Sequence, residues 1–222
     1  MAVLTAFRAP FPVPIGNRAL QASFGEPRQV SLRRSSSENP GVAVLTLITG
    51  GVRSGKSRIA LELARQRAQA KAFIATAQAL DPEMKSRIAR HRADRGADFF
   101  TIEEPVDLSA AIKEAARRSD LILIDCLNLW VTNLLTRFDK DQEIMQEFEK
   151  LLLAIQESPT HFLFVTNEAG LGIMPDNALA RRYIDLLGTL NQRMAEASDE
   201  VIWMITGLPQ WIKGGVHARL DR

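Results

Sequence analysis

The chain has 222 residues, of which 46% are hydrophobic, so it can bury one sizeable core and its length does not require two. The first 43 residues hold five arginines and two glutamates, a charge of +3, so the remainder of this +2 chain carries −1. A nearly neutral body without a basic stripe argues against a nucleic-acid-binding protein, and no apolar run approaches the roughly 18 residues of a membrane span. The only cysteine is Cys126, so no internal disulfide can form, which suits a reducing compartment such as the cytoplasm.

The first segment, residues 1–43, is expected to be a flexible extension. It holds five of the ten prolines and five serines, and it shows no sustained hydrophobic periodicity. Such a composition buries little apolar surface. The segment is rich in arginine and poor in acids, as some targeting arms are, but it lacks the apolar centre of roughly 7 to 15 residues of a secretory signal. We favour a loose extension or a misplaced start codon.

From residue 44 onward, short apolar runs alternate with helical patterns. Strands are predicted at 44–49, 72–77, 99–104, 121–126, 161–166 and 201–206, and helices at 56–70, 82–95, 106–118, 127–137, 141–157 and 178–197. Asp81 is suited to cap the second helix, Pro82 to occupy its first position and Gly96 to end it. The repeated strand–helix–strand order predicts one α/β domain over 44–222, with a mostly parallel sheet and helices on both faces.

The turn after the first strand fits the phosphate-loop pattern G-x-x-x-x-G-K-[ST]. Its residues are Gly50, Gly51, Val52, Arg53, Ser54, Gly55, Lys56 and Ser57. The glycines allow close backbone approach, and the loop N–H groups can face a β-phosphate at the positive end of the next helix. Lys56 is suited to the β- and γ-phosphate oxygens and Ser57 to Mg²⁺. Because a strand precedes the loop and a helix follows it, we predict a RecA-like P-loop NTPase rather than an incidental glycine-rich turn.

Asp125 ends a continuously apolar strand. An acid there can orient Mg²⁺ through water, as the second acid of P-loop enzymes does, whereas the alternative is a helix cap or an ordinary strand-end acid. With the phosphate loop present, we favour the metal role. A regulatory GTPase would normally carry an N-K-x-D guanine clamp, and the segment 166–170, TNEAG, does not match it.

The helix over 82–95 carries a candidate nucleophile. Met84, Ile88 and His91 share one face of this helix, and four arginines surround the histidine: Arg87, Arg90, Arg92 and Arg95. Such a histidine can be a packed, hydrogen-bonded side chain, and the arginines can be a solvated face. Alternatively, an imidazole of ordinary pKa about 6.5 is largely neutral and nucleophilic at cellular pH, and neighbouring arginines would lower that pKa and neutralise phosphate. Glu103 and Glu104 on the next strand are suited to orient the ring or a ribose.

Four stretches of the chain resemble one known family. They are TGGVRSGKSRIALELA (49–64), the segment 73–105 around RIARHRADRG, LILIDCLNLWVTNLL (121–135) and the segment 165–209 beginning VTNEAGLGIMP. Together they look like the adenosylcobinamide kinase / adenosylcobinamide-phosphate guanylyltransferase family, the bifunctional enzymes of cobalamin nucleotide-loop assembly. The likeness runs over 44–213 in order and nearly without gaps, and "RSGKS", "VTNE" and "LNQ" together make it specific.

The resemblance implies a two-step enzyme, for which the phosphate loop and Asp125 predict Mg²⁺ as cofactor. First, the γ-phosphate of ATP or GTP passes to the aminopropanol hydroxyl of adenosylcobinamide; then GMP from GTP, held covalently on His91, passes to the phosphorylated corrinoid and gives adenosylcobinamide-GDP. It assigns nucleotide contacts to the loop 50–57 and to Ala75, Thr76, Ala77, Arg92, Ala93, Asp94, Arg95, Glu103 and Asp125, with Ser57 and Asp125 on the metal side. Similar proteins are homotrimers with sites near subunit boundaries.

Some features depart from this pattern or leave it open. Some members carry two adjacent histidines where this chain has Arg90 and His91, so one candidate nucleophile is left; His161 begins a strand and His217 lies near the C-terminus. The loop 169–175 is expected at the edge of the active site or at a subunit contact. The tryptophans, Trp130, Trp203 and Trp211, are expected in the core or an interface, and Cys126 as a small buried hydrophobe. The rival functions are a monofunctional P-loop small-molecule kinase and a nucleotide-dependent interaction module.

Overall fold

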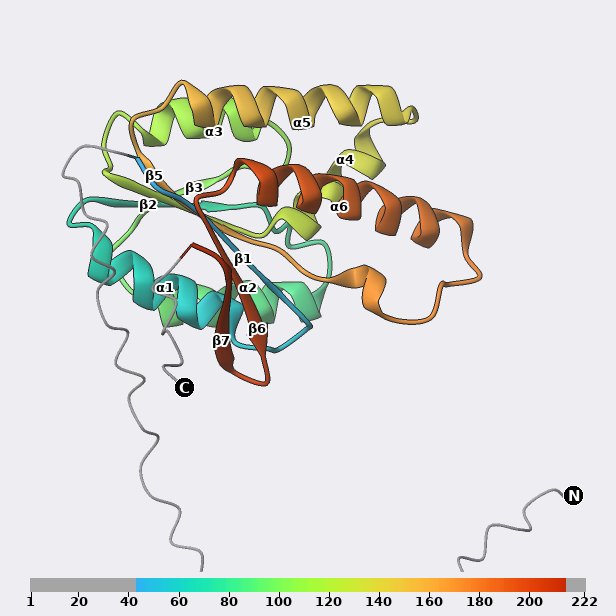
Figure 1. The fold of residues 1–222 in the computed structure, drawn as a ribbon, viewed down its shortest axis with the longest axis horizontal. Coiled ribbons are helices and arrows are strands. Elements are labelled where there is room, and N and C mark those ends of the chain that lie inside the picture. Colours follow the sequence, from blue (N-terminus) through green and yellow to red (C-terminus); the bar gives the residue numbers. More distant parts are fainter. Residues whose placement is uncertain (1–42, 215–222) are drawn as a thin grey trace, which may run out of the picture. The chain divides into compact units, whose positions relative to one another are not determined.

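The computed structural model describes residues 43–214. The predicted extension, apart from residue 43, and His217 lie outside these residues. The described strands form one seven-stranded sheet in the order β3-β2-β4-β5-β1-β6-β7 (Figure 1). They are β1 (Leu45–Gly50), β2 (Lys71–Ala75), β3 (Phe100–Glu103), β4 (Leu121–Asp125), β5 (His161–Val165), β6 (Glu200–Ile205) and β7 (Leu208–Lys213).

Helices cover both faces of the sheet. They are α1 (Lys56–Arg67), α2 (Pro82–Arg95), α3 (Leu108–Ala115), α4 (Leu127–Arg137), α5 (Asp141–Gln156) and α6 (Ala178–Ala197), with a 3-10 turn η1 (Ala169–Leu171) after β5. Figure 1 shows α1 and α2 on one side of the sheet and α3 to α6 on the other. The predicted fold class is confirmed, and the predicted helix and strand limits differ from these by a few residues, mostly at the ends.

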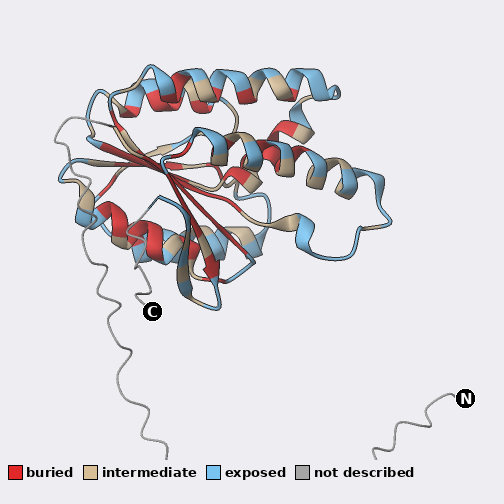
Figure 2. Cartoon of the chain, viewed as in Figure 1, coloured by how far each residue is buried: buried red, intermediate tan, exposed pale blue. Residues whose placement is uncertain are grey.

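The central strands are buried because helices cover them on both sides. All six residues of β1 and the first four of β4 are buried, as their continuous apolar runs predict, and Figure 2 shows these strands in red. The core on the α3–α6 side includes Trp130 and Phe148, whose ring centroids lie 5.6 Å apart. Trp130 is therefore a core residue, and its Nε1 donates to the carbonyl of Val106 at 2.7 Å. Within residues 43–214, no helix is both long enough and apolar enough to cross a bilayer.

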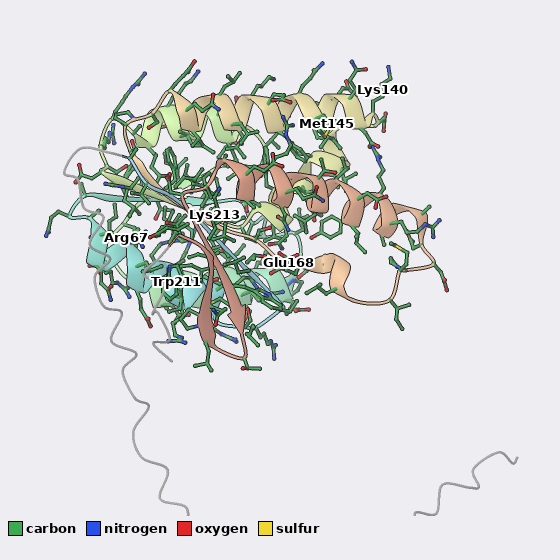
Figure 3. The ribbon with its side chains drawn as sticks, in the orientation of Figure 1. Arg67, Lys140, Met145, Glu168, Trp211 and Lys213 are labelled. Carbon is green, nitrogen blue, oxygen red and sulfur yellow. The ribbon has the colours of Figure 1, made fainter. Side chains whose placement is uncertain are left out.

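The strand β7 is the element that the sequence did not predict. Thr206 and Gly207 have φ values of 49° and 88°, so they form a two-residue turn that sends β7 back antiparallel to β6. Pro209 lies inside β7, and proline weakens a strand prediction because it has no N–H to donate. The structure tolerates it because β7 is the edge of the sheet. Lys213, labelled in Figure 3, joins the end of β7 to the end of α6, because its ammonium donates to the carbonyls of Ala195 and Glu196 at 3.0 and 2.9 Å.

The register of the parallel strands brings their carboxyl ends to one edge of the sheet. Ala75 pairs with Asp125, and Asp125 with Val165, across β2, β4 and β5. β1 lies next to β5, with Ile48 opposite Val165, so the phosphate loop leaves the sheet at the same edge. Ligands of open α/β sheets bind at this edge, and the fold therefore positions a site there.

Candidate active site

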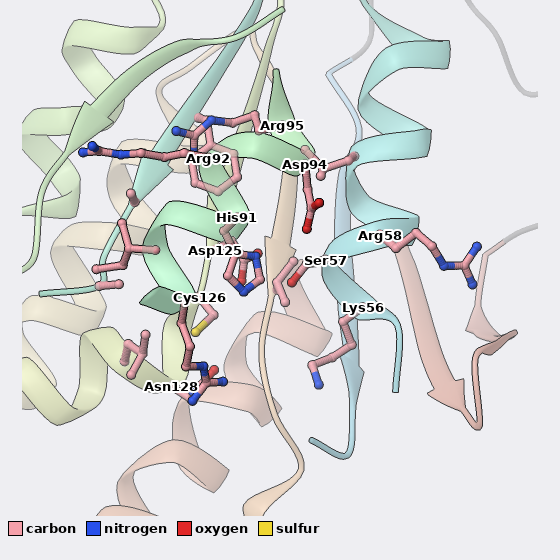
Figure 4. Close-up of a pocket in the computed structure, with 18 of the residues that line it drawn as sticks. Lys56, Ser57, Arg58, His91, Arg92, Asp94, Arg95, Asp125, Cys126 and Asn128 are labelled. Atoms are coloured by element: carbon pink, nitrogen blue, oxygen red, sulfur yellow. The ribbon is translucent and has the colours of Figure 1, made fainter. Parts of the chain in front are cut away.

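A cavity of about 980 Å³ lies at the carboxyl ends of the strands, between the phosphate loop and α2 (Figure 4). Most of the predicted site residues line it: Val52, Arg53, Ser54, Gly55, Lys56, Ser57, Ala75, Ala77, His91, Arg92, Asp94, Arg95, Glu103 and Asp125. The other predicted residues, Gly50, Gly51, Thr76 and Ala93, adjoin these in sequence without lining the cavity. Its volume suits a nucleotide-sized ligand.

The phosphate loop depends on glycine at its first position. Gly50 has a φ of 144°, and a Cβ there would lie 2.5 Å from the carbonyl oxygen of Met204 on β6. The loop leads into α1, which begins at Lys56. The Lys56 ammonium donates to the carbonyls of Gly50 and Gly51 at 2.9 and 2.6 Å, and burial lowers its pKa, although the charges of Asp125 and Glu168 act in the opposite direction. The lysine therefore lies folded onto its own loop.

Asp125 and Ser57 form the oxygen-rich part of the site. Burial raises the pKa of the Asp125 carboxyl, while a hydrogen bond from Ser57 and the charges of His91, Lys56 and Arg95 act to lower it. A carboxylate beside a hydroxyl at the phosphate loop is a donor set that fits Mg²⁺, which prefers one or two protein oxygens together with phosphate oxygens. Accordingly, residues 43–214 contain no group of three or more His, Cys, Asp or Glu side chains that could bind a metal without the nucleotide.

Thr76 fixes the ends of β2 and β4 to each other. Its side chain is fully buried; Oγ1 donates to the carbonyl of Cys126 at 2.8 Å and accepts from the N–H of Cys126 at 3.0 Å. The carbonyl of Thr76 accepts from Nδ2 of Asn133, which also donates to Pro105. The Thr76 side chain thus holds the strand ends rather than facing the cavity.

Cys126 lines the cavity and is half-buried, so it differs from the core hydrophobe that the sequence predicts. The difference arises because the residue follows the last position of β4, where the chain reaches the edge of the sheet. Burial raises the pKa of its thiol to about 12, which keeps the thiol protonated at neutral pH.

The helix α2 begins and ends as predicted. Asp81 accepts a hydrogen bond from the N–H of Met84 at 2.7 Å, Pro82 occupies the first turn, and α2 ends before Gly96. His91 is exposed, lines the cavity and lies beside Asp125 in Figure 4. The structure therefore does not support the alternative of a packed histidine.

Two of the arginines near His91 are held in place. The guanidinium of Arg95 is buried and lies 4.1 Å from the centroid of the Phe73 ring. Arg92 forms an ion pair with Glu103. Stacking and pairing limit the conformations of these two side chains, so the cation positions near the histidine are largely set before a ligand binds.

Several lining residues are not among the predicted site residues. Asn128 and Leu129 begin α4, Asn167 follows β5, and Arg58, Leu61, Glu62 and Arg65 lie on α1. The only available signal was position, because Asn128 and Asn167 each follow closely after a buried strand whose carboxyl end faces this edge.

The family model described as "Cobinamide kinase / cobinamide phosphate guanyltransferase" matches residues 46–212. The chain belongs to this family. It is 47% identical over 168 residues to the bifunctional adenosylcobalamin biosynthesis protein CobP of Pseudomonas aeruginosa, covering 76% of this chain and 96% of that protein. It is 38% identical over 182 residues to the bifunctional adenosylcobalamin biosynthesis protein CobU of Escherichia coli, covering 77% and 100%.

The chain is also similar to two solved structures, a KaiC-like protein and a recombinase. A KaiC-like protein of Pyrococcus horikoshii has a TM-score of 0.44 and 14% identity over 72% of this chain and 70% of that chain. A RadB recombinase has a TM-score of 0.42 and 15% identity over 72% and 73%.

Family membership confirms the prediction of an enzyme of the cobinamide kinase / cobinamide phosphate guanyltransferase type. It argues against the interpretation as a nucleotide-dependent interaction module.

Proposed function

We propose that the chain phosphorylates adenosylcobinamide with ATP or GTP and then transfers GMP from GTP to the product through a covalent GMP–His91 intermediate. The observation that carries the proposal is the position of His91, which is exposed and lines the same cavity as the phosphate loop, Ser57 and Asp125. One nucleotide site can therefore offer its γ-phosphate to an alcohol or its α-phosphate to an imidazole.

In the first step, the loop N–H groups and the positive end of α1 hold the triphosphate. Lys56 exchanges its two carbonyl partners for β- and γ-phosphate oxygens, which are the stronger acceptors because they are charged. Ser57 and Asp125 would hold a Mg²⁺ ion, which neutralises charge on the phosphates when bound. The acceptor hydroxyl oxygen bonds to the γ-phosphorus as the bridging bond breaks, and the nucleoside diphosphate leaves.

In the second step, a ring nitrogen of His91 attacks the α-phosphorus of GTP, and the bond to pyrophosphate breaks. The other ring nitrogen releases its proton to water. An oxygen of the corrinoid phosphate then attacks the same phosphorus, the N–P bond breaks as the ring takes back a proton from water, and adenosylcobinamide-GDP forms. Arg92 and Arg95 lie on the same helix and are suited to offset the charge of the two anions. The covalent route replaces one direct reaction between two large anions with two successive displacements, each of which is easier.

Labelling with GTP tests this proposal against a monofunctional kinase. Wild-type protein incubated with α-labelled GTP and Mg²⁺ should retain label after denaturation, and the bond should be labile to acid and stable to alkali, as a phosphoramidate is. His91→Asn should abolish the label and GMP transfer while largely keeping phosphorylation. GTP labelled on the γ-phosphate is the matched control and should leave no label. If wild-type protein retains no label but still phosphorylates the corrinoid, the proposal of a covalent intermediate is wrong and the chain is a monofunctional kinase.

We further propose that the functional unit is a homotrimer of one domain over 44–222. Four large apolar side chains are exposed on or near the loop between η1 and α6: Leu171, Ile173, Met174 and Leu179. Exposed apolar patches commonly mark subunit contacts. Light scattering should report a trimer that Ile173→Asp disrupts, whereas the control Leu153→Asp on α5 leaves it intact. A chain that begins at residue 44 should keep both activities.

A further inference from the structure

Glu168 is a carboxylate fixed to the base of the phosphate loop. It follows Asn167 at the carboxyl end of β5, the strand between the loop strand β1 and the Asp125 strand β4. Its N–H donates to the carbonyl of Gly50 at 3.3 Å, and its Oε1 accepts from Oγ1 of Thr49 at 2.5 Å. Both its backbone and its side chain are thus tied to the residues that begin the loop.

The neighbour of Glu168, Asn167, lines the cavity, and the second carboxylate oxygen of Glu168 has no partner within residues 43–214. The residue is half-buried, and among residues 43–214 no side chain pairs with Glu168 in an ion pair and no donor bonds to Oε2. Burial lowers the pKa of Lys56, and the charge of Glu168 opposes that effect, so the Glu168 carboxylate acts on the same lysine that faces the phosphate site. A negative charge there repels a triphosphate, and a neutral amide side chain could also accept the hydrogen bond from Thr49. This unfavourable charge therefore calls for a chemical role.

The cavity also has an unused hydrogen-bond acceptor in its wall. Oδ1 of Asn128 is buried without a partner among the described residues, and Asn128 and Asn167 both line the cavity. In Figure 4, Asn128 lies at the end of the view opposite Arg95. Buried acceptors are normally satisfied, so this wall is suited to a substrate that brings its own donor. An amide-linked amino alcohol has such an N–H close to its hydroxyl, and it fits this wall better than a second triphosphate does.

We infer that Glu168 is the general base of the phosphorylation step and takes no part in GMP transfer, an inference that rests on the proposed function. An alcohol must lose its proton as its oxygen bonds to the γ-phosphorus, and Oε2 of Glu168 takes that proton and later passes it to water. In GMP transfer the acceptor is a phosphate monoester, whose oxygens are already ionised at neutral pH. That step needs no base, so the same site has a carboxylate that serves one reaction only.

Glu168→Gln tests the inference with little structural change, because the amide oxygen can still accept from Thr49. The kcat for phosphorylation should fall by about 10²- to 10⁴-fold with the KM for nucleotide nearly unchanged. Labelling from α-labelled GTP, and GMP transfer to corrinoid supplied already phosphorylated, should stay within about twofold of wild type. Thr49→Val is the matched control: it removes the hydrogen bond and keeps the base, so it should reduce phosphorylation far less.

Two results would overturn the inference. Unchanged phosphorylation by Glu168→Gln excludes a base, and an equal loss of phosphorylation and labelling assigns Glu168 a structural role only. Failure of the proposed function is seen separately, in the wild type, as the absence of protein-bound label. In that case the comparison of phosphorylation rates between wild type and Glu168→Gln still decides whether Glu168 is the base.

Discussion

Replacing Thr76 by valine should destabilise the protein by about 2 to 4 kcal/mol. Valine has nearly the same shape, so no cavity forms, and the loss comes from the two hydrogen bonds to Cys126, 2.8 and 3.0 Å long. At about 1 kcal/mol each, they contribute about 2 kcal/mol; if water does not reach the freed backbone groups of Cys126, the loss approaches about 4 kcal/mol. Because Asp125 precedes Cys126, the affinity for Mg·GTP should also fall.

Urea unfolding followed by tryptophan fluorescence measures this effect. The midpoint should fall with the slope m unchanged, because the surface exposed on unfolding stays the same. Thr76→Ser keeps the hydroxyl and loses only a methyl group, so it should cost clearly less than the valine variant. A loss below about 0.5 kcal/mol for Thr76→Val, or an equal loss for both variants, would refute the argument that these two bonds hold the strand ends.

Three further predictions concern charged groups. Lys56→Met should weaken GTP binding by about 100-fold, since charge-assisted bonds contribute about 1.5 to 3 kcal/mol each; isothermal titration at constant salt measures this, and unchanged affinity contradicts the lysine's role. Burial raises the pKa of the Asp125 carboxyl above 3.8, so the folded chain binds the carboxyl proton more tightly than the unfolded chain does. Ionisation of Asp125 therefore lowers the stability of the fold as pH rises from 3.8 through the raised pKa. The melting temperature of Asp125→Asn should therefore exceed that of wild type at pH 7, and thermal scans should show this difference shrinking toward acid pH. A difference in melting temperature that does not change with pH would contradict the prediction. Asp107 caps α3, and the hydrogen bond from the N–H of Ala110 lowers its pKa below 3.8, so its stabilisation is present above 3.8 and lost as pH falls through the lowered pKa. Asp107→Ala should cost about 1 kcal/mol at pH 7 and progressively less in acid, as measured by urea unfolding at several pH values.

The sequence predicted those parts of the fold that are encoded locally. The phosphate loop, the cap at Asp81 and the apolar strands each depend on a short continuous pattern, and the structure contains all of them. The strand β7 escaped prediction because its proline and its exposed residues Leu208 and Ile212 resemble a terminal loop. Only pairing with β6 makes this segment a strand.

The site was predictable to the same extent. The phosphate loop, Asp125 and His91 could be chosen from motifs with a known chemical reason, whereas the sequence assigns no role to Asn128 or to Glu168, and both acquire their surroundings from distant segments. The Thr49 hydroxyl that binds Glu168 lies 119 residues earlier in the chain, and only the register of β1 against β5 brings the two together. Likewise, the ion pair between Arg92 and Glu103 joins α2 to β3, and no local pattern in the sequence predicts it.

The position of β1 inside the sheet affects when the phosphate loop can fold during synthesis on the ribosome. Its two neighbours are β5 and β6, and the hydroxyl of Thr46 bonds to Glu200, 154 residues later, in a cluster that Arg67 completes. The turn at Gly50 likewise closes against Met204. On the ribosome, the phosphate loop is therefore among the first parts of the domain to emerge and among the last to acquire its supports. A nascent chain should therefore be unable to bind GTP until almost the whole domain has been translated. Unfinished chains on the ribosome would then not withdraw GTP from solution.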